Sequence, residues 1–297
     1  MNYLKISVGI LLLAGIALAS ANVHLQRRES ARLLRGNVSD LIGDVSRGAY
    51  VAIVSGCYAC HTDTVNDGAP LAGGSALTTP FGTFYPPNIT SHKIAGIGSW
   101  SLENFQHAML LGRSPSGQHY YPAFPYTSYT TMQPQDLVDL KVWLDTVKPV
   151  AQPAPAHKLV WPVSIRSVLS GWKLLYFDTE RNINSSNRGD YLVNGIAHCA
   201  ECHASRNLLG GQTDLSLTGN RHGPEGKSVP GISQTDLSDW STGDIEFFLE
   251  LGMLPDGDFT GGHMANVVEY STRLMSIDDR TSIARHLLSN RNSGATQ

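Results

Sequence analysis

The cysteines of this chain fall into two pairs, and a histidine follows each pair directly. The two segments read "GCYACH" at 56–61 and "HCAECH" at 198–203. The C-x-x-C-H pattern is typical of covalent haem c attachment, because two thiols at this spacing add to the two vinyl groups of one haem. The adjacent imidazole then lies under the iron as its proximal ligand. The sequence therefore predicts two covalently attached haem c groups, held by Cys57, Cys60, His61, Cys199, Cys202 and His203.

Two other interpretations of the cysteine pairs agree less well with the sequence. A shared zinc site would need both pairs together, yet they lie far apart in sequence, at 57–60 and 199–202. A thioredoxin-type disulfide expects a βαβ pattern and has no need for the histidine. Haem attachment explains both pairs and both histidines.

A low-spin haem that transfers electrons needs a second axial ligand, and methionine there raises the reduction potential relative to histidine. Met132 lies in a loop rich in proline and tyrosine and is the candidate for the first haem. For the second haem two methionines compete. Alignment of the tails pairs Met275 with Met132, whereas Met264 in "GGHM" has a more flexible setting. Met109 is interpreted as core, and His222 and His263 as loop or surface residues.

The chain contains an internal repeat that positions these residues. Residues 47–61 resemble 188–203, and 100–117 match 240–257 without a gap at an offset of 140. Apolar residues at helical spacing, such as Leu102, Phe105 and Met109, predict short helices joined by long loops. We expect an all-α fold of two tandem class I cytochrome c-like domains around covalent haem.

The expected domains are residues 40–150 and 181–290. Between them, residues 151–180 form a proline-rich linker followed by a connecting helix over 164–177.

Residues 1–21 contain an apolar run that ends in a small-x-small pattern, which predicts a signal peptide or an N-terminal anchor. We therefore expect export to the periplasm, in keeping with haem c attachment outside the cytoplasm. The net charge of -3 argues against nucleic-acid binding, which requires a basic surface.

Several longer motifs resemble one protein family. They include "FGTFYPPNIT" (81–90), "YPAFPYTSYTTM" (121–132), "RGDYLV" (188–193) and "HCAECHASRN" (198–207). The family comprises the multihaem cytochrome c subunits of bacterial membrane-bound and periplasmic dehydrogenases. The resemblance implies Met132 and Met264 as distal ligands and Arg206 as a partner of a haem propionate.

The same resemblance implies the partners. Electrons would come from a dehydrogenase catalytic subunit, which is a quinoprotein, flavoprotein or molybdenum enzyme, and pass to a quinone or another cytochrome. Many members carry a third haem domain and a C-terminal membrane segment, and this sequence resembles the shorter two-haem members. Direct quinone reduction at a third domain is therefore not expected.

The leading hypothesis is a di-haem electron-transfer subunit without substrate chemistry of its own. The alternative is a di-haem enzyme, such as a cytochrome c peroxidase or a thiosulfate-oxidising cytochrome. Such an enzyme needs an open or unusual iron site, and the candidate methionines argue against one. A haem-based sensor would expect a fused output domain, which the sequence does not suggest.

Overall fold

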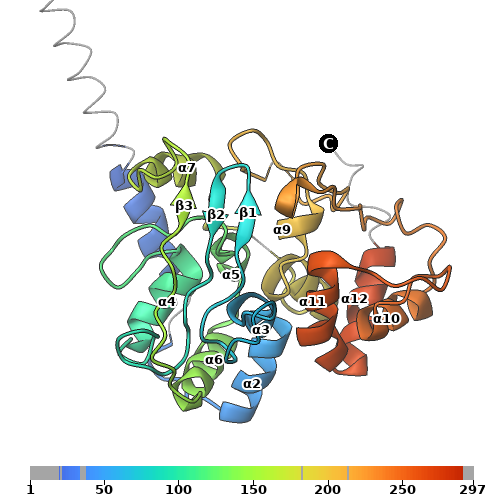
Figure 1. Ribbon diagram of the computed structural model, residues 1–297, viewed down its shortest axis with the longest axis horizontal. Coiled ribbons are helices and arrows are strands. Elements are labelled where there is room, and N and C mark those ends of the chain that lie inside the picture. The colour runs from blue at the N-terminus through green and yellow to red at the C-terminus, as the bar shows by residue number, and fades with distance from the viewer. Residues whose placement is uncertain (1–19, 21, 34–37, 182, 213, 290–297) are drawn as a thin grey trace, which may run out of the picture.

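The computed structural model describes residues 20, 22–33, 38–181, 183–212 and 214–289. This part of the chain consists mainly of short helices and irregular loops, with one small sheet (Figure 1). The predicted helical character is thus confirmed. The predicted signal peptide or anchor, residues 1–21, lies outside the described residues except for residue 20. Among the described residues, no helix is long and apolar enough to cross a membrane.

The first repeat (residues 47–147) is built around two helices, α2 and α6, that pack against each other. The terminal helix α6 begins with Pro134, whose missing N–H costs little in a first turn. The elements of this part, in chain order, are α2 (Val45–Val54), α3 (Cys57–His61), β1 (Leu77–Thr79), β2 (Gly82–Phe84), α4 (Leu102–Leu111), α5 (Tyr126–Tyr129) and α6 (Pro134–Thr146).

The second repeat (residues 188–289) presents a similar order. A helical turn carries the CxxCH motif, two helices follow the long loop, and a long helix ends the unit (Figure 1). Helices predicted from apolar periodicity in both repeats are present. The elements are α8 (Arg188–Asp190), the π-helical η1 (Tyr191–Ile196), α9 (Ala200–His203), η2 (Pro224–Gly226), α10 (Thr242–Leu251), α11 (Gly262–Tyr270), η3 (Thr272–Leu274) and α12 (Ile277–Ser289).

The offset of 140 residues reappears in how α4 and α10 begin and end. Ser101 and Ser241 each cap their helix by accepting the backbone N–H of the residue three positions later. Gly112 and Gly252 end the two helices in the left-handed region, with φ of 58° and 73°. Matching start and stop signals therefore give the two repeats the same helix at the same place.

A repeated Arg-Gly dipeptide allows the first element of each repeat to pack closely against the terminal helix of that repeat. A β-carbon at Gly48 would lie 2.0 Å from the backbone oxygen of Asp139 on α6. A β-carbon at Gly189 would lie 2.3 Å from the backbone oxygen of Ser282 on α12. Only glycine permits this approach of the first element to the terminal helix.

The small sheet is the part of the fold that the all-helical expectation did not include. Its order is β1–β2–β3, both pairs are antiparallel, and β3 (Lys158–Leu159) comes from the linker. Gly82 has a φ of 116° where β2 meets β3, and a β-carbon there would lie 2.3 Å from the backbone oxygen of Lys158. The sheet thus attaches the linker to the first repeat.

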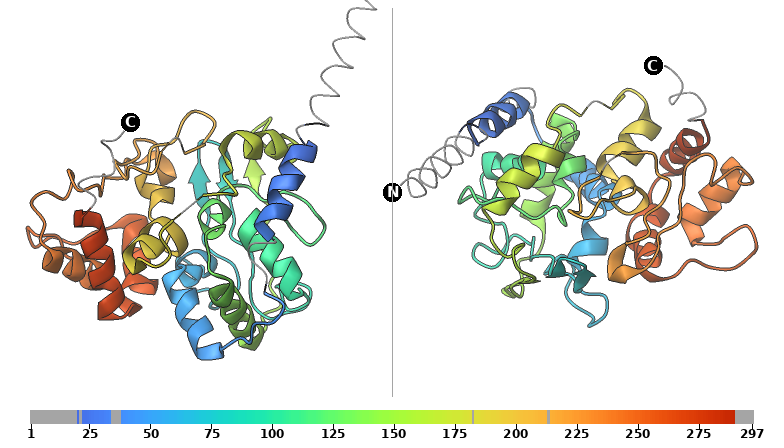
Figure 2. Two further views of the ribbon diagram at one scale, coloured as in Figure 1. Left: turned by 180° about the vertical axis from the view of Figure 1, so that it is seen from behind. Right: turned by 90° about the horizontal axis from the view of Figure 1, so that it is seen from above.

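The linker and a helical stretch before the first repeat pack on each other. The predicted connecting helix is present as α7 (Val168–Tyr176). Residues 22–33 are helical and lie beside α7 (Figures 1 and 2). Glu29 of this stretch pairs with Arg113 at 2.7 Å and with Lys173 of α7 at 3.4 Å.

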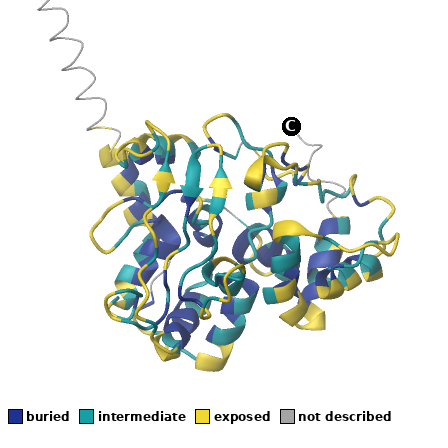
Figure 3. Cartoon of the chain, viewed as in Figure 1, coloured by how far each residue is buried: buried dark blue, intermediate teal, exposed yellow. Residues whose placement is uncertain are grey.

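The apolar core runs through both repeats without a break. One cluster of buried residues includes Val54 and Met132 of the first repeat and Leu192 and Ile283 of the second. Figure 3 shows the buried residues along the facing helices, with exposed residues on the outer loops. Because the core is shared, the two CxxCH motifs have a fixed relation to each other.

Candidate haem sites

Each CxxCH motif occupies a single helical turn that starts after a left-handed residue. Gly56 precedes α3 with a φ of 67°, and His198 precedes Cys199 with a φ of 45°. Cysteines three positions apart on a helical turn lie on the same side of it. Both motifs can therefore present two thiols and one imidazole to a single planar group.

The two motif histidines are held by the same contact. The Nδ1 atom of His61 lies 2.7 Å from the backbone oxygen of Pro87, and that of His203 lies 2.8 Å from the backbone oxygen of Pro230. Burial lowers the pKa of both histidines, which favours the neutral imidazole. A neutral ring that donates from Nδ1 leaves Nε2 free to bind a metal, and the proline carbonyl fixes the ring orientation.

The long loops after the two motifs make equivalent hydrogen bonds to the backbone of the motif histidines. The N–H groups of Gly73 and Gly219 donate to the backbone oxygens of His61 and His203, at 3.0 and 2.8 Å. Two residues before each glycine, Leu71 and Leu217 take left-handed conformations, with φ of 61° and 57°. These loops carry no regular sequence pattern, so their detailed path was not predicted.

The thiols fit haem attachment better than the two alternatives. All four cysteines lie in the described part of the chain, and none is paired in a disulfide. Burial raises the pKa of Cys57 to about 12, whereas redox-active CxxC thiols have lowered pKa values. Among the described residues, no group of three or more His, Cys, Asp and Glu side chains could hold a metal ion. The paired thiols and the oriented imidazole are the donor set that haem c requires.

The segments that precede the two motifs touch each other. The Nε2 atom of His198 lies 3.3 Å from the backbone oxygen of Ser55, which also accepts the hydroxyl of Tyr129 at 2.7 Å. The rings of Tyr129 and His198 meet edge to face, with centroids 5.5 Å apart. A β-carbon at Gly56 would lie 3.5 Å from His198 Nε2. The two attachment sites are therefore neighbours.

Comparison with known proteins identifies the family. The chain is 41% identical over 256 residues to a protein of Cereibacter sphaeroides named diheme cytochrome c-type, and the match covers 83% of this chain and 86% of that protein. This chain belongs to the dihaem c-type cytochromes. The cytochrome accordingly carries two haem c groups.

Cytochrome subunits of dehydrogenases are also similar to this cytochrome. It is 35% identical to the fructose dehydrogenase cytochrome subunit of Gluconobacter japonicus and 36% identical to the gluconate 2-dehydrogenase cytochrome c subunit of Pantoea cypripedii. The matches cover 92% and 82% of this chain, which spans 57% and 59% of the length of those subunits. The family resemblance found in the sequence motifs is thus confirmed. No protein-family model matches the chain.

The candidate methionines of the cytochrome differ in their surroundings. Met132 is 1% exposed and Met275 is 3% exposed, and both belong to the core. Each precedes its terminal helix by two residues, and each carbonyl accepts an arginine N–H, from Arg32 and Arg280 respectively. Met264 lies half-buried in α11. The structure thus matches Met132 with Met275, and the ligand roles of Met132 and Met264 stay predictions.

Glu201 is a site residue that the sequence reasoning missed. It lies between the cysteines of the second motif, and its carboxylate accepts the hydroxyls of Thr127 and Ser128 on α5 at 2.7 and 2.8 Å. Arg206 pairs with the same carboxylate at 2.5 Å. Burial opposes ionisation of Glu201, but Arg206 and the two hydroxyls outweigh it and lower its pKa. Arg206, which the resemblance assigned to a propionate, therefore contacts Glu201 here.

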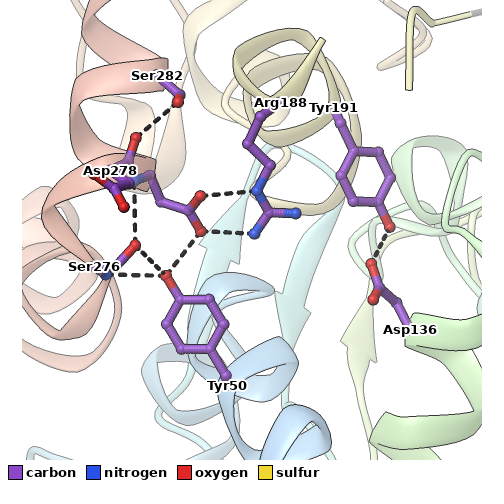
Figure 4. A network of polar contacts seen from close by, with 8 residues as sticks. Tyr50, Asp136, Arg188, Tyr191, Ser276, Asp278 and Ser282 are labelled. Atoms are coloured by element: carbon purple, nitrogen blue, oxygen red, sulfur yellow. Dashed lines mark hydrogen bonds and ion pairs between the residues drawn. The ribbon is translucent and has the colours of Figure 1, made fainter. Parts of the chain in front are cut away.

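A second set of contacts between the repeats lies around Tyr50 and Tyr191 (Figure 4). The Tyr50 hydroxyl donates to Asp279 on α12 at 2.8 Å, and Arg188 pairs with the same carboxylate at 2.6 Å. The Tyr191 hydroxyl donates to Asp136 on α6 at 2.6 Å. A hollow of about 440 Å³ is lined by α2 on one side and by Asp136, Arg188 and Ile196 on the other. The tyrosine–aspartate bonds link the two repeats next to it.

Proposed function

We propose that this dihaem cytochrome passes electrons from a separate dehydrogenase catalytic subunit, through its two haems, to a quinone or another cytochrome. It would act as an electron-transfer subunit with no substrate chemistry of its own. The proposal includes two tandem class I cytochrome c-like domains, residues 40–150 and 181–290, joined by the linker 151–180. The matching elements of the two repeats support this division.

The haem iron supplies the one-electron chemistry, and the chain sets where and at what potential it occurs. Cys57 and Cys60 would hold the first haem, and the neutral His61 would bind its iron through Nε2. In the second unit Cys199, Cys202 and His203 would have the same roles. Met132 and Met264 are proposed as the distal ligands, one for each haem.

The contact between the two attachment segments is the observation that carries the proposal. His198, next to Cys199, lies 3.3 Å from the backbone oxygen of Ser55, two residues before Cys57. Haems attached at adjacent turns can exchange electrons without an intermediate carrier. A continuous core keeps this arrangement fixed, so little reorganisation would accompany each transfer.

The partners and the location follow from the relatives and from the sequence. The fructose and gluconate dehydrogenase cytochrome subunits are named for the complexes in which they serve. We therefore infer a quinoprotein, flavoprotein or molybdenum catalytic subunit as the electron donor. The apolar run within 1–21 supports export to the periplasm, with retention as an inner-membrane anchor if it is not cleaved.

Film voltammetry of the purified haem-loaded chain tests an electron carrier against the enzyme alternative. We expect two one-electron couples and no catalytic current when hydrogen peroxide or thiosulfate is added. A catalytic current with either compound would overturn the carrier proposal and favour a peroxidase or a thiosulfate-oxidising cytochrome. A total charge of only one electron per chain would contradict transfer through two haems.

A further inference from the structure

Helix α7 buries its one charged side chain together with Leu169, and it exposes other apolar side chains to solvent. Its lysine, Lys173, is 0% exposed. Val168 is 48% exposed and Leu175 is 69% exposed, and these two residues lie two turns apart on one face. In an ordinary surface helix the apolar stripe faces the core and the charged side chains face the solvent.

The buried ammonium group of Lys173 has polar partners inside the molecule. The Lys173 ammonium donates to the backbone oxygens of Leu111 and Gly112 at the C-terminal end of α4, the latter at 3.2 Å. A cation at this end of a helix is favourable because the unpaired carbonyls carry partial negative charge. Lys173 also pairs with Glu29 at 3.4 Å. Lys173 and Leu169 thus have partners inside the molecule, whereas the side chains of Val168 and Leu175 are exposed to solvent.

The apolar surface extends beyond α7 on both sides. Trp161, which is 81% exposed, and the exposed Val160 and Ile165 precede the helix. On the other side, the indole N–H of Trp172 donates to the backbone oxygen of the exposed Leu209 at 2.9 Å. These exposed residues lie on the consecutive turns that lead into α7 and on the loop that Trp172 contacts, and clustered exposed apolar side chains mark an interaction site. We call it the α7 patch: Val160, Trp161, Ile165, Val168, Leu175 and Leu209.

The N-terminal part of the chain indicates what covers the α7 patch. The helical stretch 22–33 lies beside α7, and Arg28 donates to the backbone oxygen of Phe177, the residue after α7, at 3.0 Å (Figures 1 and 2). The apolar run that ends at Ala21 enters this stretch directly. A bilayer that held this run would therefore meet the molecule on the side of α7.

The composition of this side suits a lipid surface. Tryptophan is enriched at membrane–water interfaces, where its amphipathic ring sits at the headgroup level, and Trp161 is almost fully exposed. Arg27 and Lys158 are also exposed on the segments that border α7. Their charges would attract anionic headgroups.

We propose that the α7 patch rests on the surface of a lipid bilayer, with α7 lying in the plane of the interface. This goes beyond the proposed electron transfer, because it gives the cytochrome a fixed orientation on the membrane. The loop of Leu209, which follows the second CxxCH motif, would then face the bilayer.

Photocrosslinking to lipid tests the proposal on the purified haem-loaded chain. Vesicles of phosphatidylethanolamine and phosphatidylglycerol would contain a phospholipid with a photoreactive acyl chain, and mass spectrometry would map the labelled peptides. We expect labelled peptides from residues 160–175. The double variant V168S/L175S should lower this labelling about tenfold, because two apolar side chains no longer enter the interface. The matched control I94S/I277S changes two other exposed side chains and should label normally.

Three results would overturn the proposal. Labelling could be absent, it could be confined to residues 1–21, or it could be unchanged in V168S/L175S. If V168S/L175S keeps wild-type labelling but no longer co-purifies with a dehydrogenase catalytic subunit, the patch is a protein interface instead. Two haems per chain and two voltammetric couples, measured on the same samples, report separately on the proposed electron transfer.

Discussion

Tyr50 and Tyr191 occupy equivalent positions in the two repeats, and each donates its hydroxyl proton to an aspartate of the other repeat. Tyr50 donates to Asp279 at 2.8 Å, and Tyr191 donates to Asp136 at 2.6 Å. Both hydroxyls also accept a backbone N–H from the start of the opposite terminal helix, at 3.0 Å in each case. The contact is therefore reciprocal, as in the isologous interface of a symmetric dimer.

Removal of these hydroxyls should weaken the association of the repeats. We expect Tyr50→Phe and Tyr191→Phe each to lower the free energy of unfolding by about 2 kcal/mol, since hydrogen bonds to charged groups contribute about 1.5–3 kcal/mol. Urea denaturation of the haem-loaded protein would measure this. Tyr85→Phe is the control, because the Tyr85 hydroxyl makes no hydrogen bond to the described residues. Equal stability of all three variants would contradict a role for the reciprocal bonds.

Acid should weaken the same interface through Asp279. Burial favours its neutral acid, but Arg188 and the Tyr50 hydroxyl outweigh burial and lower the pKa of Asp279 in the folded protein. In the unfolded chain, the pKa of this carboxyl is about 3.9. As the pH falls through that value, the unfolded chain binds a proton that the folded chain does not, so stability decreases.

The pH dependence can be isolated with one substitution. The contribution of Asp279 is complete above the unfolded pKa and is lost as the pH falls through the lower folded pKa. Asp279→Asn should therefore be less stable than the wild type at neutral pH and should show a flatter decline between pH of about 5 and about 3. Asp67→Asn, at an exposed turn, should follow the wild-type curve. Parallel curves for wild type and Asp279→Asn would refute this assignment.

Glu201 should affect both redox properties and stability. Its carboxylate lies inside the second attachment motif, and a negative charge near a haem stabilises the ferric state. Glu201→Gln is expected to raise the reduction potential of the second haem and to lower the free energy of unfolding by about 2 kcal/mol. Glu103→Gln, at an exposed position of the first repeat, should leave both quantities unchanged. A potential insensitive to Glu201→Gln would sink the prediction.

The distal ligands can be counted from the weak sulfur-to-iron charge-transfer band of the oxidised protein. With Met132 and Met264 as ligands, the band has the intensity of two haems, and either Met132→Leu or Met264→Leu halves it. Met275→Leu should leave it intact. Loss of intensity in Met275→Leu instead of Met264→Leu would show that the second ligand follows the alignment with Met132. A high-spin or bis-histidine spectrum at one haem would contradict two methionine ligands.

Local signals predicted much of the fold. The apolar spacing of Leu102, Phe105 and Met109 predicted α4. The serine and glycine caps that α4 shares with α10 became apparent only in the structure. The small sheet escaped prediction because strands of two or three residues are too short to show an alternating pattern. The π-helical turn Tyr191–Ile196, with its kink at Gly195, was also not predicted, although Asn194-Gly195 is a dipeptide typical of turns.

The residues of the candidate sites also fall into two groups: those that the sequence predicted and those that only the structure shows. The CxxCH motifs could be read directly because the chemistry fixes both residue type and spacing. Glu201 occupies an unspecified position of that motif, and its partners Thr127 and Ser128 lie more than 70 residues away in sequence. The alignment of "RGAYVA" with "RGDYLV" matched Tyr50 with Tyr191, but their bonds to the opposite repeat depend on tertiary packing.

Mass spectrometry of proteolytic peptides from the purified native chain tests the central claim most directly. The account predicts one covalently bound haem on the peptide that contains Cys57 and Cys60, and one on the peptide that contains Cys199 and Cys202. An unmodified motif, with both thiols free to react with an alkylating reagent, would contradict a dihaem path through this chain.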